Sequence, residues 1–143
     1  MTDTYYRLSD VVVVRAGDER FKSVDDLGDK VVGVQMGSAS EQIADKMEGL
    51  KEVRRFNYNP EAFLDLQNKR IDALIVGYAY AVNQIRTTSG GFHVLGEVGE
   101  PSEIVMVLKK DSSSLTDALN VALKELRESG KYDEILKKWL VAE

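Results

Sequence analysis

Short apolar runs alternate with amphipathic stretches along the first 110 residues of the chain. The runs are rich in Val and Ile and are bounded by turn residues, which is typical of strands buried on both faces. They predict strands at residues 11–14, 31–35, 53–56, 73–76, 94–95 and 104–108. Between them, we expect a helical turn at 23–28 and helices at 38–47, from Asn59 (the cap) and Pro60 (the first helical position) onward, and at 78–85. This alternation indicates an α/β fold with a mixed, mostly parallel sheet flanked by helices.

The last part of the chain, residues 111–143, follows helical spacing alone. Apolar residues from Leu115 to Leu126 recur three or four positions apart after a cap-like run of serines, and Gly130 ends this predicted helix. A second helix is predicted by an apolar stripe made of Tyr132, Ile135, Leu136, Trp139 and Leu140. We therefore expect a lobe over residues 1–110 and two C-terminal helices over residues 111–143.

Composition and charge exclude several classes of protein. The net charge is −5 and no long run of Lys or Arg is present, which argues against nucleic acid or an anionic membrane surface as a partner. Cysteine is absent, so disulfides, thiolate catalysis and Cys-based zinc sites are excluded. The chain contains no apolar stretch of membrane-spanning length, and its first residues do not have the pattern of a signal peptide. We expect either a cytoplasmic protein or one whose upstream segment has been removed.

Residues that would carry catalysis are sparse. The single histidine, His93, follows Phe92 in a predicted strand and lies near no obvious nucleophile, so we interpret it as structural or solvated. The Gly-x-Ser-x-Gly elbow of hydrolases is absent. Five carboxylates on predicted surfaces lack metal-loop spacing: Asp25, Asp26, Asp45, Asp65 and Asp72. We therefore expect a binding module with no cofactor and no metal, not an enzyme.

The most informative segment for ligand binding follows the second predicted strand. Gly37 permits a tight turn, and a helix then begins with Ser38, Ala39 and Ser40. The first amides of a helix lack partners within the helix, and the helix dipole adds positive potential there, so this turn is suited to a carboxylate or phosphate. An ordinary serine N-cap explains the same segment equally well.

Aromatic residues give a second indication of a site. Tyr78 follows the strand that ends at Val76. In open α/β sheets, ligands bind outside the carboxyl ends of the strands, so Tyr78 lies where a ligand could bind. For Tyr80 we favour packing in the core.

Five segments share their order and residue types with one known family. They are, with the matching feature of the family in brackets, Asp3-Thr4-Tyr5-Tyr6 before the Val run and Arg15 (the junction between the family's lobes), residues 23–34 ("S-x-x-D-L-x-G-K-x-V-G-V"), residues 35–41 (the family's Gly-Thr-Thr turn), residues 70–73 ("R-x-D-A") and residues 131–140 ("Y-x-x-I-x-x-K-W"). Taken together they resemble the extracellular solute-binding proteins of family 3, the amino-acid-binding proteins of ABC transporters. The resemblance spans nearly the whole chain and rests on the ordered set, because no single motif is specific.

The resemblance implies one lobe of the periplasmic-binding-protein-like type II fold, in which two α/β lobes close on a ligand. It implies a small-molecule ligand, such as an amino acid or a related anion, an ABC transporter permease as partner, and a periplasmic or extracellular location. The chain resembles the family from the point where the family's first lobe ends. We therefore expect that lobe, which supplies the arginine that grips the ligand carboxylate, to be missing.

The predicted ligand-binding residues are Gly37, Ser38, Ala39, Ser40, Gly77 and Tyr78. Ala39 replaces the second Thr of the family's turn, although a backbone amide can still serve there. Gly77 stands where the family has the Asp that accepts the ligand's amino group. Loss of a charge-assisted hydrogen bond costs about 1.5–3 kcal/mol. The chain is therefore expected to bind a different ligand, to bind only with a partner lobe, or to bind nothing.

The two C-terminal helices pack on the first lobe in the family. We expect their apolar stripe around Trp139 either to fold onto the present lobe or to form a homodimer with a second chain. Two alternatives to a solute-binding protein stay open. One is the ligand-sensing domain of a receptor or regulator, and the other is a truncated or engineered single lobe without ligand binding of its own. Enzymes also share this fold, but the sequence offers no acid–base pair.

Overall fold

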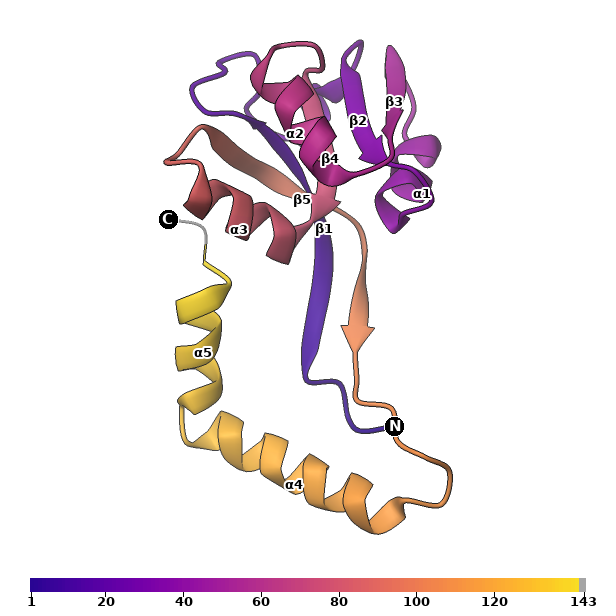
Figure 1. Cartoon of the computed structure of the whole chain (residues 1–143), viewed down its shortest axis with the longest axis vertical. Helices are drawn as coiled ribbons and strands as arrows, with labels where there is room; N and C mark the ends of the chain where they lie inside the picture. Colours follow the sequence, from indigo (N-terminus) through magenta and orange to yellow (C-terminus); the bar gives the residue numbers. More distant parts are fainter. Residues whose placement is uncertain (142–143) are drawn as a thin grey trace. The chain divides into compact units, whose positions relative to one another are not determined.

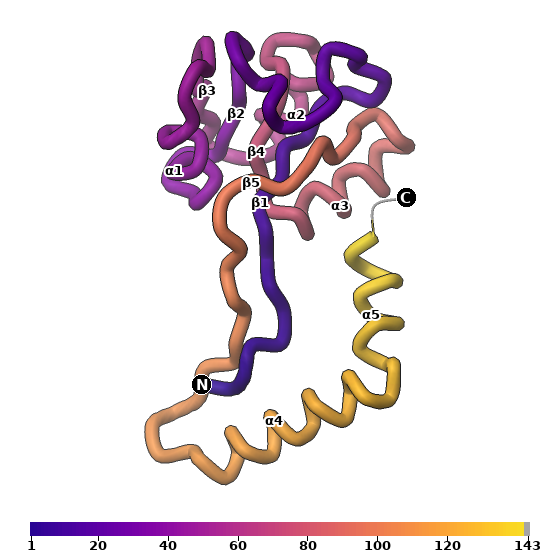
Figure 2. The backbone as a smooth tube through the Cα atoms, turned by 180° about the vertical axis from the view of Figure 1, so that it is seen from behind, coloured from indigo at the N-terminus to yellow at the C-terminus, as the bar shows by residue number. Residues whose placement is uncertain are grey.

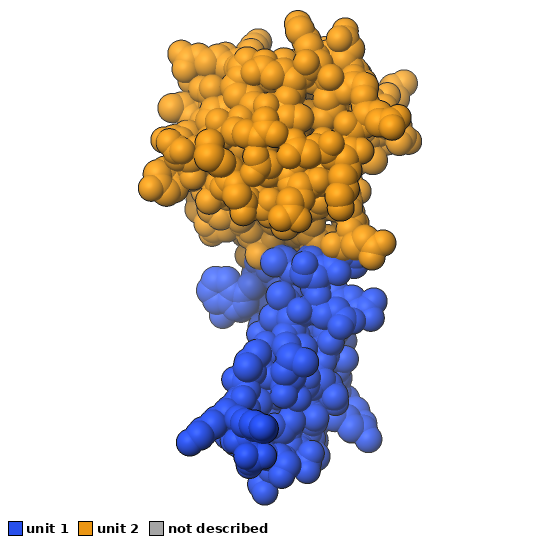
Figure 3. Space-filling model, turned by 90° about the vertical axis from the view of Figure 1, so that its right-hand side faces the viewer, with its two compact units in different colours: residues 1–8, 101–141 blue, residues 9–100, 142–143 orange. Residues whose placement is uncertain are grey.

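The computed structural model describes residues 1–141, which form two compact units (Figure 3). We call residues 9–100 the sheet unit, and residues 1–8 with 101–141 the helical unit. The structure thus assigns residues 1–8 and 101–110 to the same unit as the C-terminal helices, whereas the sequence pattern groups them with the lobe. The division after residue 110, and the packing of the tail on another lobe, stay predictions.

A five-stranded mixed sheet forms the centre of the fold (Figure 1). The strands are β1 (Tyr6–Arg15), β2 (Val31–Gln35), β3 (Glu52–Phe56), β4 (Ala73–Gly77) and β5 (Phe92–Ile104), in the order β3-β2-β4-β1-β5. Strand β2 runs parallel to both β3 and β4, and β1 runs antiparallel to β4. Strands β1 and β5 lie side by side in both views of the backbone (Figures 1 and 2). The predicted α/β fold is confirmed.

Helices cover both faces of this sheet in the sheet unit. They are the 3-10 turn η1 (Val24–Leu27), α1 (Ala39–Lys46), α2 (Asn59–Gln67) and α3 (Tyr78–Thr87). Val11 and Val13 pack on one face with residues of α2 and α3, and Val12 and Val14 pack on the other face with residues of α1 and η1. All four valines are at most 2% exposed. The Val run is therefore a strand buried on both faces, as predicted.

Predicted boundaries are wrong in β5 and at the start of α2, and β1 begins at Tyr6 and not at residue 11. Residues 94–95 and 104–108 were expected to form two strands, but β5 is continuous from Phe92 to Ile104, and residues 105–108 lie outside any strand. Gly and Pro interrupt the apolar pattern there, yet β5 is last in the strand order, and edge strands tolerate both residues. The N-cap of α2 is Tyr58, whose amide bonds to the Glu61 carboxylate, so Asn59 already belongs to the helix.

The helical unit contains α4 (Ser113–Glu128) and α5 (Lys131–Trp139), as predicted, with Gly130 in the left-handed region between them at φ +80°. Side chains of these helices hold the N-terminal segment. Asn120 Oδ1 accepts from the Asp3 amide at 2.7 Å, Arg127 donates to the Thr4 carbonyl at 3.1 Å, and the Tyr132 hydroxyl donates to the carbonyl of Tyr5. No residue of α4 or α5 is buried. Across residues 1–141, no helix combines the length and apolarity that a membrane span requires.

Candidate functional site

The sheet gathers polar groups at one edge of the sheet unit. Because β2 and β4 are parallel neighbours, their carboxyl ends reach the same edge, where α1 follows β2 and α3 follows β4. Antiparallel β1 brings an earlier part of the chain to this edge, since Asp10 pairs with Gly77. We call this set the carboxyl edge: Asp10, Gly37, Ser38, Ala39, Ser40, Gly77 and Tyr78. It contains all six predicted site residues and adds Asp10.

A tight turn at Gly37 begins the site. Its φ of +76° lies in the left-handed region, where a glycine avoids the strain of a side chain. The Gly37 amide donates to Glu41 Oε2 at 2.7 Å, so this residue shapes the turn without a spare donor. Ser38 is the N-cap of α1: its Oγ accepts from the Glu41 amide at 3.2 Å and donates to the Gln35 carbonyl at 2.6 Å.

Ion pairs hold the first turn of α1 in place. Glu41 pairs with the Arg55 guanidinium, which also binds Asp45 at 2.7 Å. The hydrogen bond from the Gly37 amide, and then the one from Arg55, lower the pKa of the Glu41 carboxyl. Glu41 is therefore ionised at neutral pH, and both of its carboxylate oxygens are engaged within the chain.

Two amides at the start of α1 stay available. Within residues 1–141, the amides of Ala39 and Ser40 have no hydrogen-bond acceptor, as is usual for the first turn of a helix. Ala39 is exposed at this helix start, whereas Ser40 is only 6% exposed. The site can thus offer two backbone donors and the positive end of the α1 dipole to an anion.

Asp10 joins the turn to the end of β4. The Ser40 hydroxyl donates to Asp10 Oδ2 at 2.9 Å, and Ser40 is only 6% exposed. The other carboxylate oxygen, Oδ1, lies 4.0 Å from the position that a Cβ at residue 77 would occupy. Sequence reasoning missed Asp10, because its place at this edge depends on the antiparallel register of β1. The available signal was an acidic residue directly before the buried Val run.

The two tyrosines of α3 contact the core of the sheet unit. Tyr78 begins the helix and packs, partly buried, against the cluster that contains Phe63 and Phe92. Tyr80 packs against the same cluster, with its ring centroid 5.8 Å from that of Phe63. Burial raises the pKa of the Tyr80 hydroxyl. The core role predicted for Tyr80 is confirmed, while a ligand contact of Tyr78 stays a prediction.

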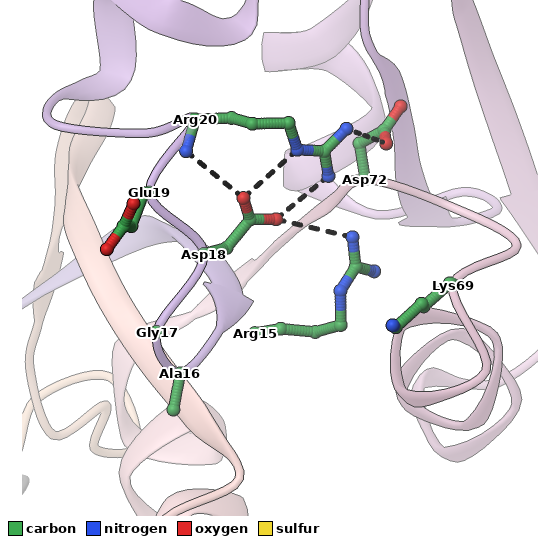
Figure 4. Close-up of a pocket in the computed structure, with 8 residues that line it drawn as sticks. All are labelled: Arg15, Ala16, Gly17, Asp18, Glu19, Arg20, Lys69 and Asp72. Atoms are coloured by element: carbon green, nitrogen blue, oxygen red, sulfur yellow. Dashed lines mark hydrogen bonds and ion pairs between the residues drawn. The ribbon is translucent and has the colours of Figure 1, made fainter.

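A second polar cluster surrounds an open pocket of about 590 Å³ beside the last residue of β1 and the residue before β4 (Figure 4). Arg20 forms a bidentate ion pair with Asp18, with Nε–Oδ1 at 3.0 Å and Nη2–Oδ2 at 2.8 Å. Arg20 also binds Asp72 at 3.0 Å. Arg15 pairs with Asp18 at 3.3 Å and donates to two main-chain carbonyls, those of Leu66 and Ile71.

This second cluster has a structural role. Hydrogen bonds from Arg20 lower the pKa of the Asp18 carboxyl to about 2. Burial acts to raise the pKa of Asp72, but hydrogen bonds from the Val31 amide and from Arg20 outweigh it, so the pKa is lowered. Asp72, from the "R-x-D-A" segment, thereby ties β2 to the loop that contains Arg20. The guanidinium groups of Arg15 and Arg20 both bind groups of the protein itself, so the residues around the pocket connect the loops that they come from.

Other candidate groups lie outside both clusters. His93 is exposed on β5, as expected for a solvated histidine. Among residues 1–141, no group of His, Asp or Glu side chains is arranged to hold a metal ion.

Residues 1–142 match the bacterial extracellular solute-binding proteins of family 3. The chain belongs to this family. It is 31% identical to the L-cystine-binding protein TcyJ of Escherichia coli (strain K12) over 98% of its own length and 53% of the relative's. Family 3 consists of solute-binding proteins and not of enzymes, so the non-enzymatic prediction is confirmed.

Solved structures give the same assignment. An ancestral arginine-binding protein bound to glutamine is 35% identical, with a TM-score of 0.68 over 96% of this chain and 62% of that one. An ancestral cationic amino acid solute-binding protein is 28% identical, with a TM-score of 0.83 over 98% of this chain and 61% of that one. The chain therefore has the fold of one lobe of this family, and it spans about half the length of the curated relatives it matches.

Proposed function

We propose that this chain binds an α-amino acid at the carboxyl edge and serves as part of the solute-binding component of an amino-acid ABC importer. The observation that carries the proposal is the pair of amides at Ala39 and Ser40, which have no acceptor within residues 1–141. Donors at the start of a helix match the carboxylate group that every α-amino acid carries. The relatives named above bind cystine, arginine or glutamine, which supports the same class of ligand.

The ligand carboxylate is assigned to the start of α1. Two main-chain donors and the helix dipole favour an anion there, and a bond between an ionised acceptor and an amide is stronger than a neutral one. Ser38 and Gly37 hold the turn through Glu41 and Gln35, so the donors keep a fixed direction. This arrangement gives specificity for a carboxylate without any basic side chain at the edge.

A charge placed at the helix start tests this proposal. Ala39→Glu adds a carboxylate at an exposed first-turn position, which helices favour, so the fold is retained while an anionic ligand is repelled. The matched control is Gln42→Glu, which adds the same charge at an exposed position of the same helix, beyond its first amides. Binding of L-glutamine, L-arginine and L-cystine is followed by amide chemical shifts. We expect loss of binding in Ala39→Glu alone; equal binding by both variants would refute the assignment.

The cellular setting follows from the family. Its members are extracellular, and we propose a periplasmic or extracellular location and delivery of the ligand to an ABC transporter permease. A pull-down of the membrane fraction with the tagged chain, read out for a permease and compared with Ala39→Glu, tests the delivery step.

We also propose that α4 and α5 mediate association with a second copy of the chain. The large apolar side chains of Leu115, Val121, Ile135 and Trp139 are 43% to 61% exposed. Exposed apolar surface on helices is a common site of association. Sedimentation of the chain and of Trp139→Ser tests this: a dimer that dissociates in the variant supports it, and a monomer at high concentration refutes it.

A further inference from the structure

The two carboxylates near the start of α1 have different partners. Glu41 is engaged by the Gly37 amide and by the Arg55 guanidinium. Asp10 accepts one hydrogen bond, from the neutral Ser40 hydroxyl, and has no ion pair within residues 1–141. A half-buried carboxylate without a cation is unusual, because loss of hydration normally requires a compensating charge. Asp10 therefore has the capacity to bind a further, positively charged group.

Space for such a group is present beside Asp10. Its partner in the sheet register is Gly77, which has no side chain. Apart from its neighbours in the chain, a Cβ built at Gly77 would meet nothing nearer than Asp10 Oδ1, at 4.0 Å. The oxygen that Ser40 does not bind therefore faces an open position at the end of β4.

We infer that Asp10 accepts the ammonium group of the ligand, an inference that rests on the proposed function. The donors for a carboxylate and this acceptor are linked through one residue, because Ser40 offers its amide at the helix start and its hydroxyl to Asp10. In an α-amino acid the ammonium nitrogen and the carboxylate carbon share one carbon atom, so the two groups must bind side by side. Asp10 supplies from β1 the negative charge that the glycine at position 77 cannot. The ligand class is thus primary α-amino acids in preference to their deaminated analogues.

Asp10→Asn is the decisive variant. Asparagine keeps an oxygen that can accept from the Ser40 hydroxyl and removes only the charge. The probes are L-glutamine and its deaminated analogue 4-carbamoylbutanoate, titrated calorimetrically into the full chain. We expect a roughly ten- to hundred-fold weaker affinity for L-glutamine, which is typical of a lost charge-assisted bond, and about the same affinity for the analogue. The matched control is Asp25→Asn, which removes an exposed carboxylate that has no ion pair in the described chain.

A second variant tests the position of the charge. Gly77 has φ −58° and ψ 139°, which any residue adopts, so Gly77→Asp fits the backbone. Added to Asp10→Asn, it is expected to restore affinity for L-glutamine by returning a carboxylate to the same open position.

The outcomes separate the two proposals. If the natural chain binds L-glutamine and Asp10→Asn binds it equally well, the role of Asp10 is refuted and the proposed function stands. If Asp10→Asn weakens both probes equally, Asp10 acts through the turn and not on the ammonium group, which also refutes the inference. If the natural chain binds none of L-glutamine, L-arginine and L-cystine, both the proposed function and the role of Asp10 are overturned.

Discussion

Protonation of Asp18 is expected to cost the sheet unit stability at low pH. The pKa of this carboxyl is about 2 in the folded chain, against about 3.9 for an unperturbed Asp, because Arg20 donates two side-chain hydrogen bonds and one main-chain hydrogen bond to it. A lowered folded pKa means stability that is complete above pH 4 and is lost as the pH falls toward 2. The difference corresponds to roughly 2.5 kcal/mol at 1.36 kcal/mol per unit. Since the Arg20 side chain is 48% exposed, solvent screening reduces this to about 1–2 kcal/mol.

The assay compares Asp18→Asn with the natural chain in urea unfolding between pH 2 and pH 7. The single tryptophan, Trp139, lies in the helical unit, so the readout is amide hydrogen exchange in β1 and β4 and not fluorescence. We expect the variant to be less stable by about 1–2 kcal/mol at pH 7 and the two curves to converge near pH 2. Asp72 has a lowered pKa of its own, so the variant keeps part of the acid sensitivity. Parallel curves across the whole range would show that the Asp18–Arg20 pair contributes nothing.

Three glycine substitutions give further predictions. Gly37 has a φ of +76°, so Gly37→Ala is expected to lower the free energy of unfolding by about 1–2 kcal/mol. The control is Gly28→Ala, at φ −53° and equally free of close neighbours, which is expected to be neutral or slightly stabilising. Equal melting temperatures of the two variants would contradict backbone strain at Gly37 as the cause. At Gly33 an added Cβ would lie 2.6 Å from Ile71 Cδ1, so Gly33→Ala is expected to cost about 1–3 kcal/mol, and Ile71→Val should recover part of that loss in the double variant. Additive effects of the two changes in urea unfolding would rule out the contact as the cause.

Much of the fold follows from the sequence because its signals are local. A run such as Val11–Val14 can bury both faces only in a central strand, and Ser23 and Ser38 each begin a helical segment as caps. These local sequence signals mispredict an element where its position in the sheet determines which residues it tolerates. The Gly and Pro residues of β5 read as breaks, but an edge position leaves them without a second neighbouring strand to disrupt.

The candidate site shows the same division between local and long-range information. The turn at Gly37 and the helix start are visible in the sequence, since their hydrogen bonds join residues at most four positions apart. The contact of Asp10 with Ser40 joins residues 30 positions apart and depends on which strands are neighbours and in which direction they run. A sequence pattern carries no register, so the sequence identified the absence of a carboxylate at Gly77 but not the carboxylate that lies beside it.

The two polar clusters of the sheet unit differ in how completely the protein satisfies them. At the pocket around Arg20, carboxylates and main-chain carbonyls engage both guanidinium groups, so the charges stabilise the fold. At the carboxyl edge, Asp10 lacks a cation and the first amides of α1 lack acceptors within the described chain. Asp10 and Asp18 share no partner, so their substitutions should act independently. Asp18→Asn should lower stability with binding unchanged, and Asp10→Asn should weaken binding with stability nearly unchanged. The two substitutions are expected to affect different properties because the carboxyl edge, unlike the pocket around Arg20, leaves hydrogen-bonding groups without partners in the described chain.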